Sequence, residues 1–294
     1  MTAESLSNAS IAVALVQMNT DNDVAANHAA AFDGIDRAAA TGARLVSLPE
    51  VWTYLGPDEG NDAAAETIPG PLVEQLAERA RRHGIYLHAG SILERVEGEP
   101  RFFNTTVVFD PRGEIIATYR KIHLFDVDLE SDTAYNESTT VAPGDEIVTF
   151  DLDGVTVGLA ICYDLRFPEL FRILALKGAK VVLLPAAFTA TTGKDHWEPL
   201  IRARAIENGC YMVAIAQIGM HTPGRWCYGR SMVVDPWGTV IAQASDQPTV
   251  LTSHLDLGLV QKVRRQIPSL RNRLPDRYAW PDTSDALVGG ATDN

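Results

Sequence analysis

Cysteine and basic charge are both scarce in this chain of 294 residues, and each shortage excludes a class of protein. The three cysteines, Cys162, Cys210 and Cys227, are too few and too scattered for a disulfide framework. We therefore expect a reducing, cytoplasmic compartment. Lys and Arg number 25 against 38 Asp and Glu, which gives a net charge of −13. Because an acidic surface repels phosphate groups, nucleic acid and anionic membranes are not expected partners.

Long apolar segments and common cofactor motifs are also missing. No apolar run reaches the roughly 18 residues that span a bilayer, and the N-terminus lacks the basic and apolar regions of a secretion signal. The seven histidines form no His-Glu-x-x-His motif, and neither a Cys-x-x-Cys pair nor a glycine-rich phosphate loop occurs. We expect no metal ion and no cofactor.

What is present is an alternation of strand-like and helix-like segments, which is typical of an α/β protein. Apolar runs of strand length predict strands at 11–18, 43–49, 86–93, 104–110 and 114–121. Between them, 24–41 and 70–83 have the apolar spacing of helices, and the second has Pro71 near its start and Gly84 after its end.

The second half of the chain repeats the pattern of the first. Residues 42–49 (GARLVSLP) recur as 178–185 (GAKVVLLP), and 107–117 (VVFDPRGEIIA) recur as 232–242 (MVVDPWGTVIA). The order is the same and the offsets, 136 and 125 residues, are similar. We interpret this as an internal two-fold repeat of two similar sheets covered by helices. The chain is expected to form a single domain over 1–280, followed by a disordered tail at 281–294.

Three polar residues at the ends of predicted strands are candidates for chemistry. Cys162 ends an apolar strand just before a predicted helix, where open α/β sheets place ligands and a helix N-terminus favours a thiolate. Glu50 follows a buried strand, whereas the matching position of the second half is Ala186. Lys121 lies in a basic cluster at the end of another strand. Each residue alone also fits ordinary packing or solvation.

Together, the segments around these residues resemble the carbon–nitrogen hydrolase (nitrilase) superfamily over about 10–280. The resemblance rests on LPE (48–50), YRKIHLFDVD (119–128), NES (136–138), GLAICYDLRFPEL (158–170), HWEPLIRARAIEN (196–208) and GRSMVVDPWG (229–238). The similarity is greatest to the Nit branch, with its deaminated-glutathione amidases and ω-amidases. It implies an α/β fold: a four-layer αββα sandwich that contains the internal repeat.

The resemblance also implies a Glu-Lys-Cys triad. By analogy, Cys162 is the nucleophile, Glu50 the general base and acid, and Lys121 the stabiliser of the oxyanion. A second glutamate of the family pattern falls on Glu137. These roles suit amide hydrolysis, because an amide needs a strong nucleophile, a proton for the leaving nitrogen and positive charge at the oxyanion. The Cys-Tyr-Asp sequence at 162–164 resembles the amidase branches, whereas true nitrilases usually carry Trp and Glu after the cysteine.

Further residues are expected to bind the substrate. They are Tyr54, Tyr163 (whose backbone N–H would join the oxyanion hole), Phe188, Thr189, Thr192 and Arg225. Arg225 aligns with a basic residue of the deaminated-glutathione amidases and is expected to meet a substrate carboxylate, although a solvated loop arginine is an equal alternative. Met220 and Trp226 depart from the polar or small residues expected there, which counts against a glutathione-derived substrate.

These features favour a cofactor-free amidase that hydrolyses the primary amide of a small carboxylated substrate to acid and ammonia through a cysteine thioester. Deaminated glutathione is the first candidate substrate, and 2-oxoglutaramate or an aliphatic amide is the second. An N-carbamoyl amino acid hydrolase and a non-catalytic scaffold of the same fold remain alternatives. The resemblance further implies a homodimer or larger homo-oligomer, with 259–277 as an arm over the partner.

Overall fold

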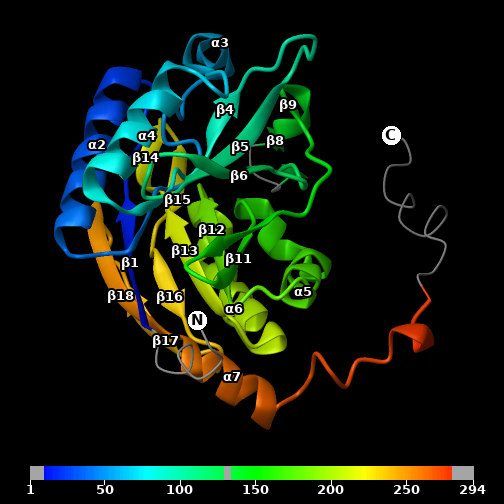
Figure 1. Ribbon diagram of the computed structural model, residues 1–294. Coiled ribbons are helices and arrows are strands. Elements are labelled where there is room, and N and C mark those ends of the chain that lie inside the picture. The colour runs from blue at the N-terminus through cyan, green and yellow to red at the C-terminus, as the bar shows by residue number, and fades with distance from the viewer. Residues whose placement is uncertain (1–9, 129–133, 280–294) are drawn as a thin grey trace, which may run out of the picture.

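The computed structural model describes residues 10–128 and 134–279, and its helices and strands alternate as the sequence predicts (Figure 1). The predicted tail at 281–294 lies outside the described residues. Two mixed sheets contain most of the strands, and two small hairpins stand apart from them. No helix of the described ranges is long and apolar enough to cross a membrane.

The first sheet has the strand order β18-β1-β2-β3-β5-β4, with β6 and β9 also paired to β5. Its strands are β1 (Ser10–Gln17), β2 (Leu45–Ser47), β3 (Tyr86–His88), β4 (Ile92–Glu94), β5 (Phe102–Phe109), β6 (Ile115–Arg120), β9 (Val141–Ala142) and β18 (Thr249–Asp256).

The second sheet has the order β10-β11-β12-β13-β16-β17. Its strands are β10 (Thr149–Leu152), β11 (Val155–Leu159), β12 (Val181–Ala186), β13 (Tyr211–Ala216), β16 (Met232–Val234) and β17 (Val240–Gln243). The two hairpins are β7 (Asp126–Asp128) with β8 (Ala134–Asn136), and β14 (Ile218–Thr222) with β15 (Arg225–Tyr228).

The two sheets share one topology, as the sequence repeat predicts. In each, three strands pair in parallel, β1-β2-β3 in the first sheet and β11-β12-β13 in the second. Antiparallel strands flank each trio on both sides. The repeated Asp-Pro-x-Gly turns also match, since Asp110 and Asp235 each accept hydrogen bonds from the backbone N–H groups two and four residues later.

Helices cover the outer faces of the sheets and complete the four-layer αββα sandwich. They are α2 (Val24–Ala40), α3 (Asn61–Ala64), α4 (Pro71–His83), α5 (Pro168–Leu176), α6 (Ala190–Asn208) and α7 (Leu257–Gln266). Short 3₁₀ helices are η1 (Asp58–Gly60), η2 (Glu137–Thr139), η3 (Cys162–Arg166) and η4 (Pro275–Arg277). In Figure 1, α2 and α4 lie outside the first sheet, and α5 and α6 lie outside the second. Buried side chains from both sheets, such as Leu15 and Leu183, form one core between them.

One predicted strand is divided in two. The apolar stretch at 86–93 forms β3 and β4, which are separated by a sharp bend at Gly90 with φ +60°. A Cβ atom at Gly90 would lie 2.0 Å from the carbonyl oxygen of Pro49, so only glycine fits there without a shift of the backbone. The bend therefore brings the β3–β4 link against the turn that carries Glu50.

A buried histidine between two strands predicts a pH-dependent stability. His88 on β3 is fully buried, and its Nδ1 lies 2.5 Å from Ser47 Oγ on β2. Burial lowers the pKa of His88 from 6.5 to about 3. At pH values between these two, His88 binds a proton in the unfolded chain but not in the folded chain, so the free energy of unfolding falls as the pH falls. The free energy of unfolding should be about 2 kcal/mol lower at pH 5 than at pH 7 because of this histidine.

The variant His88→Gln tests this expectation. It is expected to lose about 2 kcal/mol less stability than the wild type between pH 7 and pH 5, as measured by urea unfolding at each pH. Equal losses for the two proteins would mean that His88 does not carry this pH dependence.

Candidate active site

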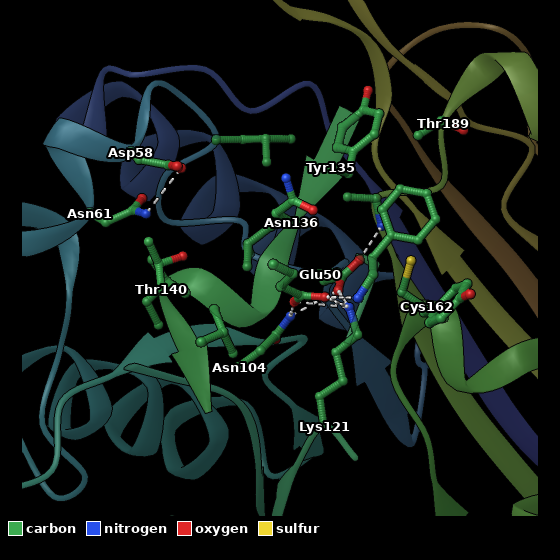
Figure 2. A pocket seen from close by; sticks show the side chains of 18 of the residues that line it. Glu50, Asp58, Asn61, Asn104, Lys121, Tyr135, Asn136, Thr140, Cys162 and Thr189 are labelled. Carbon is green, nitrogen blue, oxygen red and sulfur yellow. Dashed lines mark hydrogen bonds and ion pairs between the residues drawn. The ribbon is translucent and has the colours of Figure 1, made fainter. Parts of the chain in front are cut away.

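A cavity of about 400 Å³ opens where loops follow the sheets, and its walls include all ten residues predicted for the site. They are Glu50, Tyr54, Lys121, Glu137, Cys162, Tyr163, Phe188, Thr189, Thr192 and Arg225. Figure 2 shows Glu50, Lys121 and Cys162 around one point of the cavity, with Asp58 and Asn61 at the end away from Thr189. Within 10–128 and 134–279, no group of three His, Cys, Asp or Glu side chains has an arrangement that suits a metal ion.

Cys162 lies in a sharp turn between a strand and a short helix. Two residues separate it from the end of β11, and it is the first residue of η3. Its φ is +45°, a left-handed conformation that costs a non-glycine residue of order 1–3 kcal/mol and persists only where the surroundings enforce it. The Asp164 carboxylate holds the turn by accepting a hydrogen bond of 2.8 Å from the backbone N–H of Ile161.

The same carboxylate ties this turn to the segment that carries Lys121. Asp164 is fully buried and accepts a hydrogen bond of 2.7 Å from the hydroxyl of Tyr119. It also lies 2.7 Å from Nδ1 of His123 and accepts from that residue's backbone N–H. Since Tyr119 and His123 flank Lys121 in the chain, Asp164 fixes the turn at Cys162 relative to the lysine.

Lys121 is held between two carboxylates. Its Nζ lies 3.0 Å from Glu50 Oε1, and 3.0 and 2.9 Å from Oε1 and Oε2 of Glu137. The lysine side chain is only 2% exposed. Backbone N–H groups also bind these carboxylates at 2.6 Å, Ala187 donating to Glu50 Oε2 and Phe125 to Glu137 Oε2. A buried ammonium with this many anionic contacts is fixed in place and remains charged.

The electrostatics of the cavity keep the lysine protonated and the cysteine neutral. Burial alone would lower the pKa of Lys121, but the Glu137 and Glu50 carboxylates outweigh it and raise this pKa well above its usual value. Burial, followed by the Glu50 carboxylate, raises the pKa of Cys162 well above its usual value, against the opposing effect of Lys121. The helix predicted after Cys162 is α5, which begins at Pro168, and burial of the thiol outweighs any effect of its N-terminus on this pKa.

The turn that carries Glu50 is strained and braced from both halves of the molecule. Val51, the next residue, has φ +41°, which is rare for a β-branched residue. Its backbone N–H donates to Ser91 Oγ at 3.1 Å. From the second half, Gln217 Nε2 donates to the backbone carbonyl of Glu50 at 3.0 Å. These bonds fix the direction in which the glutamate enters the cavity.

The predicted substrate residues differ in what they offer to a ligand. The Tyr54 hydroxyl donates to the carbonyl of Pro57 at 2.7 Å, so this residue presents mainly its ring. The hydroxyls of Thr189 and Thr192 bond each other at 2.9 Å. The guanidinium carbon of Arg225 lies 5.0 Å from the centre of the Tyr135 ring, at the wall of the cavity.

Several lining residues were not predicted. They are Val51, Leu55, Gly56, Asp58, Asn61, Leu93, Asn104, Phe125, Tyr135, Asn136, Thr139, Thr140, Val141 and Ala187. Among them, Asn104 contacts both Glu50 and Glu137 and is 2% exposed. Its one signal in the sequence is an amide side chain within a run that is otherwise typical of a buried strand.

Comparison with known proteins places the chain in a family. The sequence profile of the carbon-nitrogen hydrolase family matches residues 12–265. The chain belongs to this family. Like its relatives, this carbon–nitrogen hydrolase is an enzyme that acts on carbon–nitrogen bonds other than peptide bonds.

Relatives at equal identity carry two different names. The chain is 40% identical over 271 residues to the deaminated glutathione amidase of Bos taurus, covering 90% of this chain and 83% of that protein. It is 40% identical over 270 residues to the human omega-amidase NIT2, covering 92% and 97%. Its structure is similar to that of the C. elegans NitFhit protein, with a TM-score of 0.85, 37% identity and coverage of 92% and 67%. These similarities confirm the predicted superfamily, its Nit branch and the αββα fold.

Proposed function

We propose that this carbon–nitrogen hydrolase is an amidase that cleaves small carboxylated amides through a thioester on Cys162. The observation that carries the proposal is the arrangement of three groups at one buried point: a neutral thiol, the Glu50 carboxylate and the Lys121 ammonium. This combination supplies a nucleophile, a proton acceptor and a fixed positive charge.

The proposed reaction balances with these side chains and one water molecule. Cys162 Sγ attacks the amide carbonyl carbon while Glu50 takes the thiol proton, and Lys121 with the backbone N–H of Tyr163 stabilises the oxyanion. Glu50 then gives its proton to the leaving nitrogen, and the carbon–nitrogen bond breaks to leave a thioester. Glu50 next deprotonates water, which attacks the thioester carbon. The carbon–sulfur bond then breaks to release the acid, and Glu50 returns its proton to Cys162 Sγ. Glu137 keeps the ammonium in position through two oxygen contacts.

Two substrates share the acyl group that we propose for this site. Deaminated glutathione and 2-oxoglutaramate both carry a 2-oxoglutaryl unit, and relatives named for each chemistry are equally similar to this chain. The expected release of ammonia from a primary amide fits 2-oxoglutaramate. The corresponding bond of deaminated glutathione is a secondary amide, whose leaving group is the amine of cysteinylglycine. An assay therefore has to follow both products. We place deaminated glutathione first and propose that Arg225 binds the substrate carboxylate, since it is a cation at the cavity wall.

The variant Arg225→Gln tests this substrate class. We expect KM for deaminated glutathione and 2-oxoglutaramate to rise about 10- to 100-fold, because a charge-assisted hydrogen bond is lost. The kcat/KM for a neutral aliphatic amide should change less than about threefold. If the wild type prefers the aliphatic amide or an N-carbamoyl amino acid over both 2-oxo acids, the substrate class is wrong although the triad stands.

Assembly and location are further proposals. We propose that residues 1–280 form a single domain. We also propose that the chain assembles into a homodimer or a larger homo-oligomer. The segment after α7 runs away from the body of the molecule in Figure 1, and Leu274 and Tyr278 on it are exposed. A mass of 32.0 kDa in light scattering at micromolar protein would contradict a dimer. We also propose a cytoplasmic location, which the three unpaired cysteines support and cell fractionation tests.

A further inference from the structure

The two carboxylates of the site share one ammonium and one uncharged donor. Glu50 and Glu137 both contact Lys121, so two negative charges meet a single positive charge in a buried space. The uncharged donor is Asn104 on β5. Its Nδ2 lies 2.9 Å from Glu50 Oε1 and 3.3 Å from Glu137 Oε1.

The side-chain amide of Asn104 and the backbone N–H groups bind different oxygens of the two glutamates. The backbone N–H groups of Ala187 and Phe125 bind the outer oxygens, Oε2 of Glu50 and Oε2 of Glu137. The inner oxygens, Oε1 of each glutamate, both receive a bond from the Asn104 amide. Like charges brought together in a buried site favour uptake of a proton, and hydrogen bonds donated to the charged forms oppose it. One amide with two N–H bonds therefore serves both carboxylates.

The backbone of Asn104 also fixes the distance to the lysine. The backbone N–H of Lys121 donates to the carbonyl of Asn104 at 2.9 Å, so the amide and the ammonium start from neighbouring backbone positions. An arginine or lysine at this place would add a second cation, and an aspartate a third carboxylate. Asparagine supplies two donors without changing the charge of the site.

We propose that Asn104 is a positioning residue of the hydrolase, holding the carboxylates of Glu50 and Glu137 in register with Lys121 so that Glu50 is placed to accept the thiol proton. This inference rests on the proposed function, because it assigns a task to Glu50 in the amidase reaction. Asn104 acts through the glutamates and needs no contact with the reacting atoms.

The ionisable groups around this amide come from several elements. Glu50 comes from the turn after β2, Lys121 from the end of β6, Glu137 from η2 and Cys162 from η3. Glu94 is bound elsewhere, since it pairs with Arg120 and accepts a hydrogen bond from Thr105, whose side chain leaves the opposite face of β5. The carboxylates that Asn104 contacts are therefore those of Glu50 and Glu137.

The variant Asn104→Leu removes the donor and keeps the volume nearly constant. We expect kcat to fall about 10- to 100-fold and KM to change less than about threefold. A kcat that falls while KM stays is the sign of a positioning role, because a general loss of packing would affect both. The matched control is Thr106→Val on the same strand, since Thr106 is fully buried and its hydroxyl has no partner within the described residues. The control should keep wild-type kcat and wild-type KM.

A second variant keeps the inference testable if the leucine does not fold. Asn104→Asp has the same shape and is expected to lower kcat at least as much as Asn104→Leu, because a third carboxylate repels the two glutamates. Folded Asn104→Leu with kcat within about threefold of wild type would overturn the proposal. So would a folded Asn104→Asp variant with wild-type kcat. If instead the wild type hydrolyses no amide, the proposed function fails, and this result is distinct from either outcome.

Discussion

Replacing Cys162 with alanine is expected to lower kcat for every amide substrate at least about 10⁴-fold, with the fold intact. The thiol is the nucleophile of the proposed thioester, and no other cysteine lies among the lining residues of the cavity. Without the nucleophile, Glu50 and Lys121 only place charges around the bound amide, and these charges accelerate its hydrolysis weakly. Measurement of both amine and ammonia release, with circular dichroism melting of each protein, checks the result.

Cys210→Ala is the matched control. Cys210 is also buried, and burial raises its pKa to about 12, but it precedes β13 and does not line the cavity. Its removal should cost some stability and leave kcat within about twofold of wild type. Loss of activity in the Cys210 variant together with retained activity in Cys162→Ala would place the chemistry elsewhere.

Replacing Lys121 with methionine is expected to affect both catalysis and stability strongly. Loss of an oxyanion donor typically lowers kcat about 10²- to 10³-fold. The variant also leaves Glu50 and Glu137 without their shared cation, and breaking a buried ion pair in this way costs about 3–5 kcal/mol. Urea unfolding of the variant and the wild type measures the stability difference, and amine and ammonia release measures the loss of kcat.

The control for Lys121→Met is Lys262→Met, since Lys262 is an exposed lysine on α7. It should change neither kcat nor stability by a measurable amount. The double variant with Lys121→Met and Glu137→Gln should regain part of the lost stability, because it carries one buried carboxylate fewer. If the double variant is less stable than Lys121→Met alone, the destabilisation does not come from unpaired charge.

The sequence predicts the fold and the centre of the site because both depend on short-range patterns. The repeated Gly-Ala-x-x-Val and Asp-Pro-x-Gly segments indicate two similar sheets, and both sheets contain a trio of parallel strands flanked by antiparallel strands. Glu50, Lys121 and Cys162 lie within three residues of the carboxyl ends of β2, β6 and β11, where α/β sheets place ligands. Because β11 belongs to the second sheet, their meeting also depends on how the two sheets pack together.

The residues that sequence reasoning missed reach the cavity from elements without a motif. Asn104 lies within β5, in a run of buried residues. The sequence of this run does not distinguish an asparagine that donates to two carboxylates from an ordinary core residue. Tyr135 comes from a hairpin whose position over Arg225 depends on the packing of distant segments. The protonation of Cys162 could not be predicted either, because it depends on how deeply the thiol is buried and on the nearby Glu50 carboxylate.

The central claim is that Cys162 carries the 2-oxoglutaryl group as a thioester during turnover. The most direct test is acid quenching of the enzyme during turnover, followed by peptide mapping with mass spectrometry. Deaminated glutathione and 2-oxoglutaramate should give an adduct of the same mass on Cys162, because they share the acyl group and differ in the leaving amine. Product release from both substrates with no adduct on Cys162, or with an adduct on another residue, would contradict the account.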